Sequence, residues 1–167
     1  MRKYIYTILV VAILMVQASG AFAEGRKIAL KPRRLAFLAG FKGAVEWKDG
    51  APGSDWASAA EDTALSAGST VRTGKDSSAV IMINGDSGDA ESVSIELDSE
   101  SRISIVEMAV NASTGNKSSL LSLELGKADV KAKNLRKGSV FEVKTPTSVI
   151  SAQGSDSSFR IQVERSE

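Results

Sequence analysis

The chain contains no histidine and no cysteine, and these two absences exclude several large classes of function. Ser-His-Asp and Cys-His nucleophile arrangements need an imidazole, and the common zinc sites need imidazole or thiolate ligands. Glycine-rich phosphate loops and dinucleotide fingerprints are missing as well. The remaining possibilities use oxygen atoms alone, either as pairs of catalytic carboxylates or as ligands of hard cations such as calcium. We therefore predict no catalytic residue, no metal ligand and no cofactor.

The first 23 residues follow the order of a secretory signal peptide. Arg2 and Lys3 precede an apolar run over 8–16, and small residues follow up to Ala23. The largely apolar stretch from Tyr4 to Val16 has about 13 residues, whereas a membrane-spanning helix needs roughly 20. A short signal anchor that is not cleaved is the alternative. We expect cleavage after Ala23, which predicts a periplasmic or secreted protein without stable membrane insertion.

Cleavage would leave a chain of moderate length and balanced charge. The mature part has 167 − 23, or 144, residues, which suits one domain that folds without disulfides. Loss of Arg2 and Lys3 reduces the 21 basic residues to 19 against 20 acidic ones, a net charge of −1, which gives no indication of nucleic-acid binding. A basic arm at 24–41 opens this part, and Arg33 and Arg34 are candidate contacts for anionic envelope polymers. A solvated, flexible arm is the alternative.

From 42 to 167 the dominant pattern is that of short β-strands separated by Gly, Asn, Asp and Ser. Alternation of apolar and polar residues gives each strand one dry face and one wet face. The alternating segments are 91–97, 101–106, 121–125, 141–143 and 159–163. Residues 80–83 are apolar on both faces and are predicted to form the most buried strand, whereas 56–66 is predicted to hold a short helical turn. We expect an all-β fold, an antiparallel sandwich or solenoid-like β-roll of about 9–11 short strands.

Several short motifs follow one another in order along this part of the chain. The motif residues are Gly43, Trp56, Gly68, Thr73, Gly74, Gly85, Gly126, Thr145, Pro146 and Gly154. The marker is Val71-Arg72-Thr73-Gly74, and Asn84-Gly85 is a hairpin signal because both residues tolerate positive φ. This order resembles the FecR domain family over about 43–163. The resemblance implies a structural role for the motif residues.

The end of the chain departs from the family pattern. The family usually reads Arg-Gly-Thr with a phenylalanine two residues later, but this chain has Gln153-Gly154-Ser155 and then Phe159. The arginine and threonine are thus replaced and two residues are inserted. Any role that the family assigns to this turn does not carry over directly.

The resemblance implies a non-enzymatic module that binds or senses a partner in the cell envelope. The partner would be an envelope protein or a polymer such as peptidoglycan, and sheet faces and loops can carry such binding without a reactive group. Trp47 is predicted to be the more exposed tryptophan and is a candidate for stacking on a sugar. Trp56 is predicted to close one end of the core.

A second interpretation is a regulator in a FecR-like cell-surface signalling pathway that ends on a sigma factor. Such regulators are similar to this chain in the envelope domain but add a cytoplasmic domain and a membrane helix before it. From the signal-like residues at the start and the end at Glu167, we expect neither a cytoplasmic domain before the envelope domain nor a receptor-facing extension after it. We therefore expect no direct regulation of a sigma factor.

A third interpretation is a carboxylate-based glycan hydrolase, which needs one acid and one base or nucleophile. Glu96, Asp98 and Glu100 are predicted to share one strand face, and Asp86 and Asp89 to lie in a turn. Acids on the wet face of a strand are usually solvated, so no enzyme is predicted. The turn also lacks the spacing and the distal glutamate of an EF-hand, so calcium binding is not predicted.

Overall fold

The structure, a computed structural model, describes residues 36–83, 91–154 and 156–164, and over these ranges the protein is all-β without a helix. The strands are β1 (Ala36–Lys42), β2 (Val45–Lys48), β3 (Ala57–Ser58), β4 (Ala64–Leu65), β5 (Thr70–Thr73), β6 (Ser78–Ile83), β7 (Ser92–Leu97), β8 (Arg102–Val110), β9 (Lys117–Lys133), β10 (Val140–Lys144), β11 (Val149–Gln153) and β12 (Ser157–Val163). The all-β prediction is confirmed. The strand number exceeds the expected range because β3 and β4 have only two residues each and carry no alternation signal.

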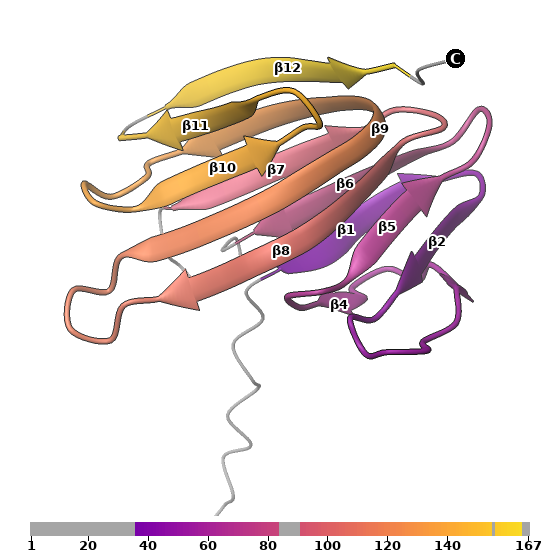
Figure 1. The fold of residues 1–167 in the computed structure, drawn as a ribbon, viewed down its shortest axis with the longest axis horizontal. Helices are drawn as coiled ribbons and strands as arrows, with labels where there is room; N and C mark the ends of the chain where they lie inside the picture. The colour runs from indigo at the N-terminus through magenta and orange to yellow at the C-terminus, as the bar shows by residue number, and fades with distance from the viewer. Residues whose placement is uncertain (1–35, 84–90, 155, 165–167) are drawn as a thin grey trace, which may run out of the picture. The chain divides into compact units, whose positions relative to one another are not determined.

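The sheet is built around β9, the longest strand. One edge of β9 pairs with β8 and then β7, and the other edge pairs with β10 and then β12. Neighbouring strands are antiparallel throughout the order β3-β2-β5-β8-β9-β7-β6-β1-β4. Among the described strands, β9 and β10 are the two that pair in parallel. Figure 1 shows β9 bending from alongside β8 to alongside β12. This bend curls the sheet, so that two half-sheets share one core.

The predicted alternation decides which side chains fill this core. In β7, Val93, Ile95 and Leu97 are buried while the serines between them are half-buried and Glu96 is exposed. Inward-facing residues of the other strands join them in one cluster of mostly aliphatic side chains. Leu125 departs from its predicted alternation because it lies next to the bend of β9, where it is half-buried.

Two predictions about local structure are wrong. In β6, Ile81 and Ile83 are buried, but Val80 and Met82 are half-buried on the opposite face. The strand therefore alternates like its neighbours, because only one face of the curled sheet is packed. Residues 56–66 hold β3 and β4 instead of a helical turn, since each short strand gains hydrogen bonds from a neighbour already in the sheet. Such tertiary pairing outweighs a weak local helix preference.

Strands pass from one half-sheet to the other at a line of bends that we call the corner row, formed by 43–44, 74–77, 98–101 and 126–127. Gly126 has a φ of 89°, and a Cβ atom there would lie 2.5 Å from Ser101 Cα. Since the bend interrupts the ladder, hydroxyl groups complete its hydrogen bonds.

Two hydroxyl groups hold the centre of the corner row. The Lys127 amide donates to Ser101 Oγ at 2.9 Å, and the Ser101 amide donates to Thr73 Oγ1 at 2.9 Å. Beside them, the Gly74 amide donates to the Ala44 carbonyl at 2.8 Å. The motif residues Thr73, Gly74 and Gly126 thus meet at one place in the fold.

A buried ionic cluster, formed by Glu91, Lys117, Arg136 and Ser139, closes the core where β7 and β9 begin. The Glu91 side chain is 2% exposed, and its Oε2 lies 3.2 Å from Lys117 Nζ. The Arg136 amide donates to Glu91 Oε1 at 2.7 Å. Burial raises the pKa of Glu91, but the Arg136 amide, the Ser139 hydroxyl and the Lys117 ammonium group together outweigh it and hold that pKa below its ordinary value of 4.5.

Several sequence predictions lie outside the described residues. These are the signal peptide at 1–23, Arg33 and Arg34, and the Asn84-Gly85 hairpin. The described part opens with β1, which pairs with β4 and β6, so the sheet starts within the segment assigned to the basic arm. Across the described ranges, no helical segment has the length and hydrophobicity that a membrane crossing requires.

Candidate functional site

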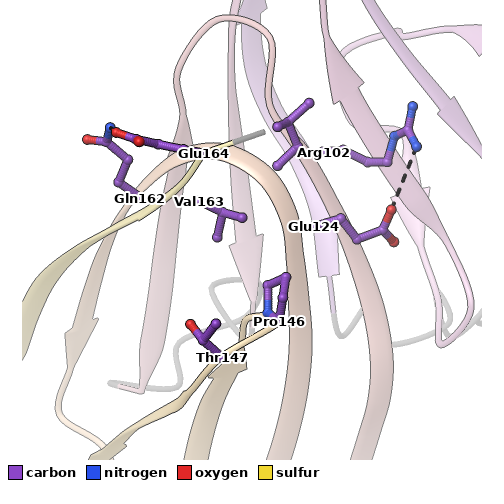
Figure 2. Close-up of a pocket in the computed structure, with 8 residues that line it drawn as sticks. Arg102, Glu124, Pro146, Thr147, Gln162, Val163 and Glu164 are labelled. Atoms are coloured by element: carbon purple, nitrogen blue, oxygen red, sulfur yellow. Dashed lines mark hydrogen bonds and ion pairs between the residues drawn. The ribbon is translucent and has the colours of Figure 1, made fainter. Parts of the chain in front are cut away.

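An open cleft lies beside β9, between the end of β10 and the end of β12 (Figure 2). The cleft has a volume of about 550 Å³ and is lined by Arg102, Glu124, Leu125, Pro146, Thr147, Gln162, Val163 and Glu164. β10 pairs with β9 as far as Ser122, and β12 pairs with β9 from Gly126 onward. Residues 123–125 of β9 therefore have no described strand beside them on that edge. The cleft is a break in the sheet rather than a hole in the core.

The β10–β11 turn forms one wall of the cleft, and its sequence explains where the ladder stops. Pro146 follows β10 and has no amide hydrogen to donate to β9. The Thr145 Oγ1 accepts hydrogen bonds from the amides of Thr147 and Ser148, at 3.4 and 3.0 Å, which stabilises the turn. The motif residues Thr145 and Pro146 therefore shape the cleft.

Arg102 of β8 and Glu124 of β9 supply charge on one side of the cleft (Figure 2). Arg102 Nη1 lies 3.8 Å from Glu124 Oε2, and each side chain is 45% exposed. This distance exceeds that of a charge-assisted hydrogen bond, about 2.7–2.9 Å. Glu124 is held by Ser104 Oγ, which donates to Glu124 Oε1 at 2.8 Å. Arg102 is thus held loosely and can donate to an anionic group of a ligand.

A second hollow, of about 210 Å³, continues from the cleft over the corner row. It shares Arg102 with the cleft and adds Arg72, Lys75 and Glu100. Arg72 is positioned by Glu46 on the neighbouring strand, with 2.7 Å between Nη2 and Oε2. The two hollows together carry three basic side chains beside the family marker.

The two tryptophans are both half-buried but contact different parts of the protein. Trp47 is half-buried and packs against the core, because it shares a face of β2 with the buried Val45. Trp56 is half-buried outside that cluster, with its ring centroid 4.0 Å from the guanidinium carbon of Arg72 and 5.2 Å from Lys48 Nζ. The prediction that Trp56 closes one end of the core is therefore wrong, whereas the prediction that Trp47 is the more exposed of the two stays a prediction, since both rings are half-buried. Sugar stacking by Trp47 stays a prediction.

The predicted carboxylate face is not present in the fold. Glu96 lies in β7, whereas Asp98 and Glu100 lie in the turn before β8, where Glu100 has a φ of 54°. The turn breaks the two-residue period, so these acids do not share a strand face. Asp86 and Asp89 lie outside the described residues. Among the residues that are described, no group of three or more acids is arranged to hold a metal ion.

The remaining motif glycines lie at turns and close approaches. Gly68 has a φ of 91°, and a Cβ atom there would lie 2.7 Å from Gly50 Cα. A side chain at Gly68 would therefore push two backbone segments apart. Gly43 lies in the corner row, Gly154 follows β11, and Gly85 lies outside the described residues.

Sequence reasoning missed the cleft and, apart from Pro146, did not assign its lining residues to a site. Arg102, Glu124, Thr147 and Gln162 come from β8, β9, the β10–β11 turn and β12. Pro146 was a usable signal, because it marks a place where strand pairing stops. Its relation to the others depends on how β9 pairs with both β10 and β12, which no local pattern reveals.

Asp129 and Arg160 form an exposed ion pair on a part of the sheet that does not line the cleft. Arg160 Nη2 lies 2.7 Å from Asp129 Oδ2. The hydrogen bond from Arg160 lowers the pKa of Asp129, and the same bond raises the pKa of Arg160. The side chain of Arg160 is 69% exposed, so this pair contributes little to stability.

Comparison with known families agrees with the motif order. The family described as "FecR protein" matches residues 69–167, more than half of the chain. The match covers β5 to β12, hence the cleft, and it begins later than the resemblance seen from Gly43. No curated protein and no solved structure matches the chain. FecR domains occur in regulators of cell-surface signalling and are generally non-enzymatic. The chain belongs to the FecR family.

Proposed function

We propose that the protein is a non-enzymatic binding or sensing module of the cell envelope, and that its cleft recognises an envelope protein or a polymer such as peptidoglycan. The observation that supports this most directly is the cleft itself, because it is solvent-open and is built entirely from residues of the family match. Its polar groups are suited to binding a ligand without transforming it.

The lining of the cleft favours a ligand that carries carboxylate and amide groups. Arg102 offers a guanidinium group, which matches the geometry of a carboxylate. Thr147 and Gln162 add a hydroxyl and an amide from opposite walls, and Leu125 and Val163 supply apolar surface. Peptide stems of a cell-wall polymer and acidic segments of a protein share this chemistry.

Export is part of the proposal, since envelope partners are reachable only outside the cytoplasm. The layout of the first 23 residues supports it. Protein isolated from the native cell should begin at Glu24 and fractionate with the periplasm or the medium. Cytosolic protein that still begins at Met1 would contradict an envelope function.

Binding assays with matched arginine variants test the role of the cleft. The mature chain is co-sedimented with purified peptidoglycan sacculi and is used as bait in native envelope extract. Arg102→Ala should weaken the observed binding by about tenfold or more, because a hydrogen bond to a charged group is lost. Arg160→Ala is the control, since Arg160 is also an exposed arginine paired with one acid but does not line the cleft.

The outcomes of this experiment separate the site from the function. Equal binding by Arg102→Ala and by the unmodified chain would place the ligand away from the cleft. No binding to sacculi and no retained envelope protein would refute the function itself.

A role in cell-surface signalling is a second candidate, and membership of the FecR family favours it. The partner would then be a receptor or another signalling protein, so the extract would yield a bound protein while sacculi would not bind. An uncleaved product that fractionates with the membrane would favour this candidate.

A further inference from the structure

β11 is an edge strand with one neighbour, β10, among the described strands. Val149, Ser151 and Gln153 are exposed, and Val149 at 57% is the most exposed of the large hydrophobic side chains described. The strand reads Val-Ile-Ser-Ala-Gln and thus has no charge and no proline. Its pairing with β10 contains no bulge. Natural proteins use charge, proline and bulges to keep edges from pairing, so β11 lacks these protections.

The backbone of β11 is correctly oriented to accept another strand. The Thr145 amide donates to the Ser148 carbonyl at 2.8 Å, which closes the β10–β11 hairpin. Hydrogen-bonded and non-hydrogen-bonded pairs alternate along an antiparallel ladder. Ile150 and Ala152 therefore bond to β10, whereas the three exposed residues direct their amide and carbonyl groups away from it.

The edge formed by β12 differs from that of β11. β12 pairs with β9 on one side, and Arg160 lies at its centre with an exposed side chain. Two copies of β12 paired about their centre would bring two guanidinium groups face to face. Like charges directly opposite each other destabilise a strand pair. β12 is therefore protected against pairing with itself, and β11 is not.

We propose that β11 pairs antiparallel with β11 of a second copy of the chain, about a two-fold axis at Ser151. In this register Val149 faces Gln153 of the second copy, Ile150 faces Ala152, and Ser151 faces itself. None of these pairs is charged, and each copy covers the exposed Val149 of the other. The edge is thus complementary to itself, which is what a two-fold interface requires.

The expected dimer is weak and depends on concentration. The pairing adds backbone hydrogen bonds along one five-residue strand, which is a small contact beside a standard interface of about 1,600 Å². The proposal does not depend on the cleft, because β11 pairs through its free edge. Its failure and the failure of the proposed function are therefore separable.

Two double variants test the register. In Val149→Lys/Gln153→Lys, two pairs of lysines would face each other across the axis, and the dimer dissociation constant should rise about tenfold or more. In Val149→Lys/Gln153→Glu, each lysine faces a glutamate, and the dimer should form at least as tightly as in the unmodified chain. Both variants change the same two exposed positions, so they control for each other, and circular dichroism checks that each is folded.

The measurement is sedimentation equilibrium of the mature chain over a wide concentration range. A chain that stays monomeric throughout would overturn the proposal. An undiminished dimer in the lysine–lysine variant would place the interface elsewhere and would also overturn it. Equal weakening of both variants would show that the strands do not pair in this register.

Discussion

The corner row and the buried ionic cluster stabilise the same core by different physical means. At the corner row, glycine backbone and neutral hydroxyl groups replace the missing ladder bonds around Gly126 and Ser101. At the ionic cluster, a buried carboxylate depends on a cation and on amide donors. At the corner row, the space available for a side chain limits which residues are tolerated. At the ionic cluster, the balance of buried charge sets that limit. Steric and electrostatic constraints on stability therefore act at different places in this domain, so each can be changed without the other.

The largest effect is expected when a side chain is added in the corner row. Gly126→Ala should lower the free energy of unfolding by about 3–5 kcal/mol, because the positive φ is strained and the new Cβ meets Ser101 backbone. Gly53→Ala is the matched control, since Gly53 has a φ of 79° but no atom within 4 Å of a Cβ. It should lose only about 1–2 kcal/mol. Urea denaturation measures both, and equal losses would show that close contact at the corner is unimportant.

A slightly smaller effect is expected when the cation is removed from the ionic cluster. Lys117→Met should cost about 3 kcal/mol, because Glu91 would remain buried without its closest charge partner. Glu91→Gln/Lys117→Met should cost less than the single variant, since no uncompensated charge remains. Urea denaturation at neutral pH compares the two. A double variant as unstable as the single one would show that packing rather than charge dominates there.

The smallest effect, and the most direct contrast, is expected on changing the pH. The folded state holds the pKa of Glu91 below 4.5, so ionised Glu91 stabilises the fold above that pH. This contribution should decline as the pH falls through the folded pKa, and the difference in stability between the unmodified chain and Glu91→Gln should decline with it. The loss of stability caused by Gly126→Ala involves no titrating group, so it should not change with pH. If the effects of Glu91→Gln and Gly126→Ala on stability changed with pH in the same way, the ionic cluster would not differ from the corner row in its electrostatics.

Local pattern was sufficient to predict strands and their inward-facing residues. In β7, the alternation of Val93, Ile95 and Leu97 predicted their burial, because a strand has a period of two whatever its neighbour. The same reasoning failed for Val80 and Met82, whose apolar character does not reveal that one face of β6 is left unpacked. It also placed Trp56 at the end of the core, whereas Trp47 is the tryptophan that packs against the core cluster.

The sequence by itself determined the all-β class, the family and the turns at Thr73-Gly74 and Gly126, because these depend on side-chain periodicity and on residues that tolerate special backbone angles. Only the tertiary structure decided that β9 bends to pair with both half-sheets, that Glu91 meets Lys117, and that a cleft opens between β10 and β12. These features depend on the register between segments far apart in the chain. Register is set by the packing of the whole core, and no short stretch of sequence carries that information.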